Sequence, residues 1–401
     1  MKNKLFHNTN VVCIASLCLR CDTNIALCAE SSAEMREFMN TNEIIKKSIM
    51  ITLLTALLIT PWNPAISNYC YAAGSSQAKD VSITISAAGD CTFGSDRSSP
   101  ASVNFYSVYK RKKDPAYFFK KVKKIFANDD MTLVNFEGTL TKRNTREPKK
   151  FAFRGSPGYV RILKKGSVEA VSFANNHCRD FGAGSYKDTI HYLNRAGVTY
   201  SSYSKVSVYK VKGKKIGMIS VNGLENISTV KALIKKGMKK LKKKETDIRI
   251  VSMHAGIEHN YNVSSTQKSI ARYAVNRGAS LVLGHHPHNL QGIERYKGVY
   301  IVYSLGNFCF GGNTNPPDKD TMIFQQTFVF HKDKLKKKKS TAKIIPCSIS
   351  SASGINNYQP APAKGRKKAR ILRKLDRMCQ PLGLTLRDKK RKLTCTLYKK
   401  K

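Results

Sequence analysis

Short apolar runs alternate with amphipathic stretches from residue 81 onward. The apolar runs have the length and β-branched content of strands, and the stretches between them carry apolar residues at helical spacing. The runs predict strands over residues 81–88, 131–136, 168–174, 206–211, 215–221, 247–253, 280–283, 299–303 and 322–330. The stretches predict helices over residues 117–127, 157–164, 184–196, 227–243 and 265–277. Strands that alternate with helices indicate an α/β fold.

The regular pattern ends with the last predicted strand. Residues 334–339 are nearly all lysine, and residues 356–364 are rich in Pro and Ala, which is typical of a linker. We therefore predict a folded domain over residues 81–331 and a lysine-rich C-terminal extension over residues 332–401. The extension is predicted as either a small added domain or a mobile polycationic arm.

An apolar segment near the N-terminus has the order of a secretory signal. Lys46-Lys47 precedes the apolar residues 49–60, and the small residues Ala72-Ala73 follow. The apolar run is shorter than the roughly 20 residues of a comfortable membrane span. We therefore expect residues 1–73 to be an N-terminal extension that carries a signal peptide or an uncleaved anchor. An exported protein, extracellular or associated with the cell envelope, is the predicted outcome.

The charge of the chain is strongly positive. Lys and Arg number 71 against 26 Asp and Glu, which gives a formal net charge of +45. Such a field concentrates polyanions near the surface, and nucleic acid, anionic cell-wall polymer, acidic lipid and polyglutamate are the candidates. The sequence has no nucleic-acid-binding signature, which disfavours nucleic acid. The alternative reading is a lysine-rich surface that is simply solvated.

Five of the predicted strands run directly into polar clusters. The clusters are Gly89-Asp90, Asn135-Phe136-Glu137-Gly138, Ala174-Asn175-Asn176-His177, His254-Ala255-Gly256 and Gly284-His285-His286-Pro287-His288. Loops at the carboxyl ends of strands gather into one crevice in an open α/β sheet, so these side chains should converge. A single strand-end Asp or His is usually a cap or a hydrogen-bonding residue, but five clusters in succession favour a site.

Those side chains suit a divalent metal. Carboxylate oxygen, amide oxygen and imidazole nitrogen are ligands for Mn, Fe, Zn or Mg, and no thiolate is needed. A carboxylate can bridge two ions, and an ion lowers the pKa of its water enough to make a nucleophile. The sequence therefore predicts one or two divalent ions at this edge of the sheet.

The order and spacing of these motifs resemble the CapA family of poly-γ-glutamate capsule biosynthesis proteins. The matching segments are Gly89-Asp90, residues 134–138, residues 174–182, residues 254–258, residues 284–288 and residues 303–308. The resemblance covers roughly residues 81–312. It implies a fold similar to the calcineurin-like metallophosphoesterases, which is a four-layer αββα sandwich with a two-metal site, here followed by a basic C-terminal extension.

The resemblance also implies roles for particular residues. Asp90 would be the carboxylate of the first metal, and Glu137 would be the bridging carboxylate. The second metal would be held by Asn176 and His254. The remaining metal ligands would be His286 and His288. The resemblance further implies that His177 protonates a leaving group or stabilises a transition state, and that Asp180 orients His177.

Two positions depart from the superfamily pattern. Thr92 stands where a histidine usually follows the first aspartate, and Glu137 is one methylene longer than the usual aspartate. Cys91, Cys178 and Cys309 lie inside the motif loops, where buried inert thiols are favoured over additional soft ligands. The first metal position is therefore the one that the sequence puts in question.

The resulting functional hypothesis is an exported protein that acts in the synthesis, export or anchoring of poly-γ-glutamate or a similar anionic envelope polymer. Its hydrolase-like site would use metal-activated water on a phosphoester or an amide-type bond. The expected partners are the polymer, or another cell-wall polyanion, and membrane-bound polymer synthesis machinery. The alternative is a non-catalytic module that uses the same fold and cationic surface to hold polyanion.

Overall fold

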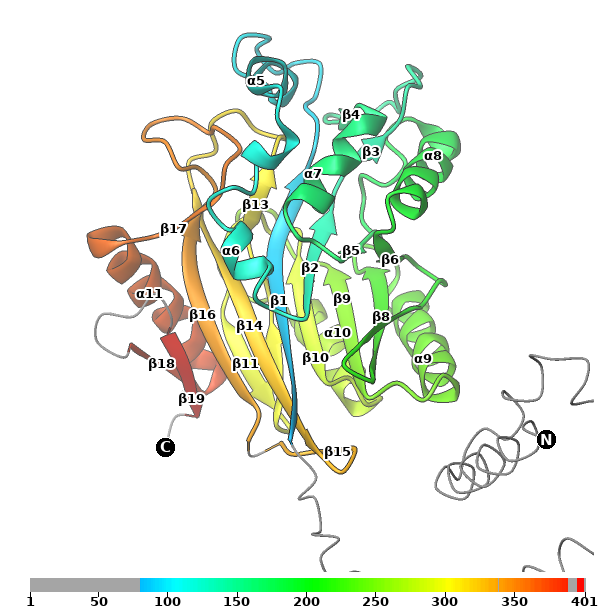
Figure 1. The fold of residues 1–401 in the computed structure, drawn as a ribbon, viewed down its shortest axis with the longest axis vertical. Coiled ribbons are helices and arrows are strands. Elements are labelled where there is room, and N and C mark those ends of the chain that lie inside the picture. Colours follow the sequence, from blue (N-terminus) through cyan, green and yellow to red (C-terminus); the bar gives the residue numbers. More distant parts are fainter. Residues whose placement is uncertain (1–79, 338, 389–394, 400–401) are drawn as a thin grey trace, which may run out of the picture. The chain divides into compact units, whose positions relative to one another are not determined.

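Two β-sheets lie at the centre of the fold (Figure 1). The computed structural model describes residues 80–337, 339–388 and 395–399, so the predicted signal or anchor segment lies outside the described residues. The larger sheet runs in the order β18 (Leu384–Asp388), β19 (Cys395–Lys399), β16 (Thr341–Ser348), β14 (Asp320–His331), β1 (Val81–Thr92), β2 (Met131–Phe136), β5 (Ala170–Ser172) and β6 (Thr199–Ser201). Three short strands pair beside this path, namely β13 (Asn307–Phe310) with β1, β15 (Lys334–Leu335) with β14 and β17 (Ala361–Pro362) with β16.

The second sheet has a parallel centre and antiparallel edges. Its order is β11 (Ile293–Tyr296), β12 (Val299–Val302), β10 (Leu281–His285), β9 (Ile248–His254), β8 (Lys214–Asn222) and β7 (Ser207–Val211). β12, β10, β9 and β8 are parallel, as are β1, β2, β5 and β6 of the larger sheet. A further pair, β3 (Thr139–Leu140) and β4 (Arg154–Gly155), follows the end of β2. Parallel strands bring their carboxyl ends to one edge, which is where the candidate site lies.

The two sheets pack against each other through one apolar core. Leu133 of the larger sheet and Ile250 and Leu283 of the second sheet belong to the same buried cluster. Val134, the neighbour of Leu133 on β2, points to the opposite face and packs with Leu163 and other residues of the helical layer. This alternation of side chains along a strand explains why the strands are apolar throughout, since both faces are buried.

Helices cover the outer face of each sheet. α6 (Lys123–Phe126), α7 (Val160–Lys165) and α8 (Gly182–Arg195) lie over the larger sheet, with short 3₁₀ turns at Pro115–Tyr117 and Pro157–Tyr159, and α5 (Phe105–Lys112) lies beyond the end of β1. α9 (Ile227–Lys243) and α10 (Ser265–Asn276) cover the second sheet. The layers are therefore helix, sheet, sheet and helix, and the predicted α/β sandwich is confirmed.

The helix predicted over residues 227–243 has the bounds of α9. Asn226 caps it by accepting a hydrogen bond from Ser228 N at 2.9 Å, and its buried face carries Val230, Ile234 and Leu241 at helical spacing. Among the described residues, no helix has the length and apolarity needed to cross a membrane.

The helix predicted over residues 117–127 is instead two short segments. Asp114 caps the 3₁₀ turn through Ala116 N at 2.8 Å, and Lys120 N and Val122 N then bond to carbonyls three residues back. These tight turns interrupt the α-helix before α6 begins. Four phenylalanine and valine side chains of this stretch are fully buried, so packing of both sides overrides the local helical pattern.

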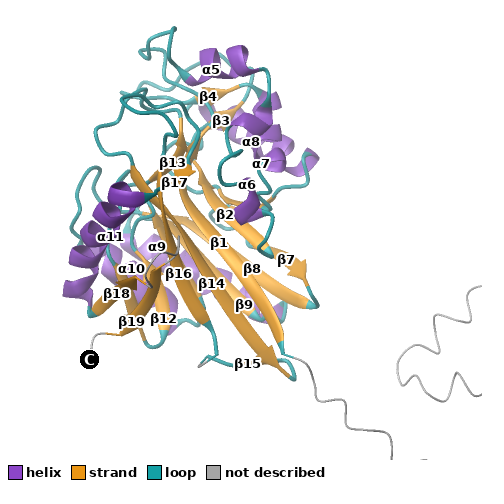
Figure 2. Cartoon of the chain, turned by 60° about the vertical axis from the view of Figure 1, so that its left-hand side comes forward, coloured by secondary structure: helices purple, strands orange, loops and turns teal. Residues whose placement is uncertain are grey.

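The residues that follow β14 continue the larger sheet. β16 pairs with β14 from Asp320↔Ser348 to Thr327↔Thr341, and α11 (Gly365–Cys379) places Ile371 in the core between the sheets. A 3₁₀ turn at Gln380–Leu382 leads from α11 to β18, and Figure 2 shows α11 beside β18 and β19 at the edge of the strands. The boundary predicted after residue 331 lies between β14 and β15.

Candidate metal centre

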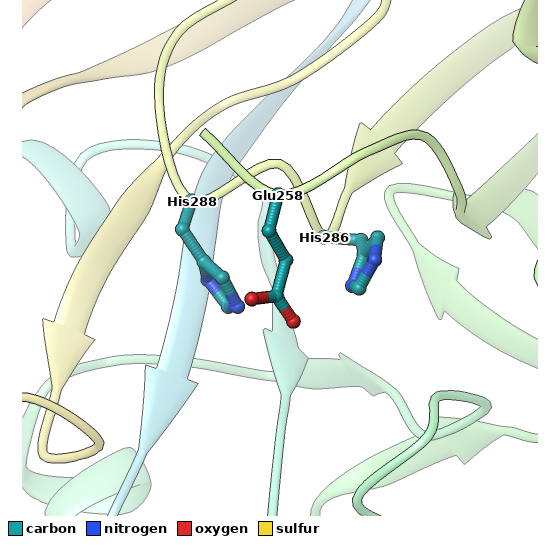
Figure 3. Close-up of side chains that lie close together, drawn as sticks. All are labelled: Glu258, His286 and His288. Carbon is teal, nitrogen blue, oxygen red and sulfur yellow. The ribbon is translucent and has the colours of Figure 1, made fainter. Parts of the chain in front are cut away.

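The carboxyl ends of four strands bring five of the predicted ligands together. Asp90 lies near the end of β1, Glu137 follows β2, His254 ends β9, and the loop after β10 carries His286 and His288. Ligand atoms of Asp90, Glu137 and His254 lie within 4.8 Å of one another. Those of His286, His288 and Glu258 form a second such group, drawn in Figure 3. The sequence predicted every member of these groups except Glu258.

Glu137 is the centre of the buried cluster. Its Oε1 atom has no hydrogen-bond partner among the described residues. Three imidazole Nε2 atoms surround this oxygen, with His288 at 3.6 Å, His177 at 3.8 Å and His254 at 3.9 Å. These N···O distances are too long for hydrogen bonds. Atoms that bind the same ion are separated in this way, because each of them lies about 2 Å from the metal. An orphaned buried carboxylate oxygen among imidazoles fits a cation site.

Asp90 joins the two groups. Its Oδ2 atom lies 3.3 Å from His288 Nδ1 and accepts a hydrogen bond from His286 N at 3.3 Å. Asn135 donates from Nδ2 to Asp90 Oδ1 at 2.9 Å and lies 3.4 Å from Glu137 Oε2. Asn135 and Glu137 are two residues apart, so they face the same side of the chain at the end of β2. Asn135 therefore positions both carboxylates, a role that the sequence analysis did not assign.

Asn176 contacts the first group through His254. Its Oδ1 atom lies 2.9 Å from His254 Nε2, and the other ring nitrogen of His254 lies 3.3 Å from Asn135 Nδ2. His285, which was also not assigned, is buried with Nδ1 at 3.2 Å from Asp90 Oδ1. Thr92 is fully buried and its hydroxyl has no partner among the described residues; as a threonine it offers no imidazole to the cluster.

Burial and charge set the protonation of the cluster. Burial raises the pKa of Glu137 well above its ordinary range and lowers that of His254 well below its own. Burial alone would raise the pKa of Asp90, but contacts with His285 and His288 hold it well below the usual value. Burial, reinforced by His288, lowers the pKa of His286 to about 4, so its imidazole is neutral and able to bind metal.

His288 carries the charge that balances these acids. Burial alone would lower its pKa, but Glu137 and Asp90 outweigh that effect and raise it to about 9. Asp90 and Glu137 are fully buried, and among the described residues no Lys or Arg pairs with either of them. A bound divalent ion would add to the positive charge of His288 in compensating these two buried carboxylates.

The backbone around the ligands is tightly constrained. His286 and His288 have φ values of 97° and 58°, a left-handed conformation that residues with side chains rarely adopt and that clusters at functional sites. His259 N donates to Pro287 O at 2.9 Å, which fixes the loop of Glu258 beside the loop of the two histidines. Glu258 thus reaches the site through a contact between two loops; it ends the motif segment 254–258, but its part in the site depends on this contact.

Two motif glycines allow the strand ends to approach this region. A Cβ atom on Gly89 would overlap the carbonyl oxygen of Gly306, and one on Gly284 would overlap that of Tyr303. Only glycine fits where backbone comes this close to backbone. The glycines that precede Asp90 and His285 therefore bring the segment 303–306 against both ligand-bearing strand ends.

His177 and Asp180 form a pair at the mouth of the cluster. His177 Nδ1 lies 2.7 Å from Asp180 Oδ2, and Asp180 also accepts hydrogen bonds from Phe153 N at 2.6 Å and Lys149 Nζ at 2.8 Å. Burial lowers the pKa of His177 despite the opposing effect of Asp180. Because Asp180 fixes Nδ1, the Nε2 atom of His177 is directed toward Glu137.

A cavity of 270 Å³ opens onto these side chains. His177, Glu258 and His288 line it together with Phe151 and Phe310. The three cysteines of the motif loops, by contrast, are fully buried, and burial raises the pKa of the thiols of Cys91, Cys178 and Cys309. They are protonated at neutral pH, as expected of inert thiols.

The fold and the site define an α/β sandwich protein with a candidate metal centre at the strand ends. Residues 84–312 match the family model described as bacterial capsule synthesis protein PGA_cap, and the chain belongs to this family. The PGA biosynthesis protein CapA of Bacillus subtilis is 32% identical over 216 residues, which are 48% of this chain and 56% of the relative. The capsule biosynthesis protein CapA of Bacillus anthracis is 27% identical over 220 residues, 48% of this chain and 54% of the relative.

The matched regions thus span about half the length of these curated relatives. A solved structure of a 5′-nucleotidase from Candida albicans aligns with a TM-score of 0.39 and 12% identity, over 75% of this chain and 58% of that one.

Proposed function

We propose that this chain binds divalent metal at the carboxyl ends of its strands and hydrolyses a phosphoester or amide-type bond in an anionic envelope polymer. The observation that carries the proposal is the convergence of two ligand groups, Asp90 with Glu137 and His254, and Glu258 with His286 and His288. Asn176 completes the first group through its contact with His254. Bound ions of this kind supply Lewis acidity and lower the pKa of water.

The residues present fit such ions. Glu137 Oε1 and His286 Nδ1 are buried and have no hydrogen-bond partner among the described residues. Carboxylates and neutral imidazoles are the donor set that Mn, Fe, Zn and Mg share.

His177 is proposed to transfer the proton. Asp180 accepts the Nδ1 hydrogen of His177, so Nε2 would face the reacting bond and give a proton to the leaving atom, which is oxygen in a phosphoester and nitrogen in an amide-type bond. General acid help of this kind is typically worth about a hundredfold to ten-thousandfold. Phe153, whose ring centroid lies 4.4 Å from that of His177, limits the movement of the imidazole.

The polymer is proposed to be poly-γ-glutamate or a similar polyanion. Two relatives are named for PGA or capsule biosynthesis, and a third, from Mycobacterium tuberculosis, is named a probable polyglutamine synthesis accessory protein. The net charge of +45 supports an anionic partner. We place the chain in synthesis, export or anchoring of that polymer, next to membrane-bound synthesis machinery.

Export is part of the proposal, because Lys46-Lys47 and the apolar residues 49–60 have the order of a secretory signal. Cell fractionation tests it with the full-length chain. Recovery outside the cytoplasm or with the envelope supports export, and a stable cytoplasmic pool with an intact N-terminus contradicts it.

A non-catalytic polyanion-binding module is the second candidate. Thr92 favours it, because this residue supplies no imidazole at the first metal position. Metal-dependent turnover of bis(p-nitrophenyl) phosphate, measured for wild type and for His177→Gln, distinguishes the two candidate functions.

The catalytic proposal predicts that His177→Gln keeps its metal and loses at least about a hundredfold in turnover. The module predicts that wild type has no metal-dependent turnover, while the retention of polymer is the same in both proteins.

A further inference from the structure

We propose that a basic groove beside the metal centre binds an extended anionic chain whose reacting bond lies at that centre. This inference rests on the proposed function and names a substrate-binding surface for it. The groove has a volume of 740 Å³, against 270 Å³ for the cavity over the metal ligands. A ligand that fills both is therefore longer than the unit that reacts.

The groove and the metal cavity adjoin each other. Ser99 lines both of them. Ala152 lines the groove, while its neighbours Phe151 and Phe153 line the metal cavity. An extended chain that binds at the metal ligands and passes Ser99 would therefore reach the groove.

Positive charge dominates the groove. Arg97, Lys142, Arg146 and Arg154 line it, and Asp96 is the single acidic residue among its described lining residues. Guanidinium groups recognise carboxylates and phosphates through paired hydrogen bonds. The chemistry of the groove therefore selects repeated anionic groups.

Asp96 does not neutralise this surface. Its carboxylate is 4% exposed and accepts hydrogen bonds from Ser98 N at 2.9 Å, Ala152 N at 2.9 Å and Arg146 Nη2 at 3.0 Å. Asp96 holds the loop of Ser98 next to the segment of Ala152, so its carboxylate lies within the wall of the groove and does not face a ligand. Arg146 compensates that charge and leaves the other three cations uncompensated.

The cations are available to a ligand. Arg97 and Lys142 are exposed and have no ion pair among the described residues. Arg146 is held by its ion pair with Asp96 at 3.0 Å and is not counted among the available cations. Arg154 donates to Arg143 O at 2.7 Å and lies 5.2 Å over the ring of Phe181, contacts that hold the guanidinium in place and leave its charge.

The test compares two charge reversals of equal size in the full-length chain. Arg97→Glu with Lys142→Glu alters the groove. Lys235→Glu with Lys239→Glu alters exposed positions of α9, which do not line the groove or the metal cavity. Both pairs change the net charge by the same amount, so a purely non-specific effect of charge is the same in both.

The measurements are the Kd values of a fluorescent γ-glutamate oligomer and of a polyphosphate with the same number of charges. We expect the groove variant to weaken binding about tenfold or more, since each lost attraction becomes a repulsion, and the α9 variant to weaken it less than threefold. The two ligands distinguish the sources of the anion: a larger loss for one of them identifies its anionic group as the one the groove binds. Circular dichroism and metal content check that both variants are folded.

Equal losses in the two variants, or no loss in the groove variant, would overturn the inference. Its failure is distinguishable from that of the proposed function. A wild type that lacks turnover but shows the groove-specific loss retains the binding surface without the catalysis. A wild type with metal-dependent turnover and no groove-specific loss retains the catalysis and refutes the groove.

Discussion

Replacement of Asp180 by asparagine tests whether His177 is held for proton transfer. Asp180 is fully buried and accepts three hydrogen bonds, from His177 Nδ1, Phe153 N and Lys149 Nζ. Asparagine has nearly the same size, but it has one acceptor oxygen, and its NH₂ group must face one of these donors. At least one donor therefore loses its partner, and Lys149 loses its counter-ion.

The expected cost follows from these contacts. Hydrogen bonds to a charged group contribute about 1.5–3 kcal/mol, and part of that is kept by the remaining oxygen, so the free energy of unfolding should fall by about 2 kcal/mol. The orientation of His177 is lost at the same time, so turnover of bis(p-nitrophenyl) phosphate should fall about a hundredfold. Metal content should stay near that of wild type, because Asp180 belongs to neither ligand group.

The assays are urea unfolding, steady-state turnover and metal analysis on the same preparations. Asp188→Asn is the matched control, since Asp188 lies on α8 and pairs with the exposed Arg143 at 3.0 Å, away from the metal ligands. It should change turnover less than threefold. An Asp180→Asn protein with normal metal content and turnover within threefold of wild type would refute the role of the pair.

Three further predictions concern the second ligand group, the groove and the close approach of the backbone. Glu258→Gln should weaken metal binding at least about tenfold in a competition titration with a chelator, and unchanged affinity would remove Glu258 from the ligands. Burial alone would raise the pKa of Asp96, but hydrogen bonds from Ser98 and Ala152 lower it to about 2. The ionised carboxylate therefore contributes about 2 kcal/mol to the free energy of unfolding above about pH 4, and this contribution is lost as the pH falls toward 2. The difference in unfolding free energy between wild type and Asp96→Asn should shrink over that range, and a constant difference would contradict it. Gly284→Ala should lower the free energy of unfolding by about 2 kcal/mol or more, because its Cβ would overlap Tyr303. Gly158→Ala, which has open space around it, should be nearly neutral, and equal losses in the two variants would contradict the close approach at Gly284.

The elements that local patterns determine were predictable from the sequence. α9 has its predicted bounds because Asn226 caps it and its apolar positions recur at helical spacing. The stretch before α6 was not predictable, since the burial of both of its sides replaces an α-helix by tight turns. β16 was missed because it follows the lysine-rich residues 334–339, and only its pairing with β14 makes it a strand.

The site also contains residues that local patterns reveal and residues that only the folded chain reveals. Asp90, Glu137 and the histidines could be inferred because each lies at or just after the end of a strand, and strand ends meet at one edge of a sheet. Glu258 reaches the site through the contact of two loops, where His259 N meets Pro287 O, and this contact exists only in the folded chain. The role of Asn135 likewise depends on distances to two carboxylates that lie on different strands.

The metal content of the purified full-length chain shows whether the two ligand groups bind ions. Mass spectrometry of wild type and of His286→Ala with His288→Ala, after equilibration with Mn, Zn or Fe and removal of free ion, gives the number of bound equivalents. We expect about two equivalents in wild type, one for each ligand group, and the loss of at least one in the double variant. A wild type without bound metal, or a double variant with the full content of wild type, would contradict it.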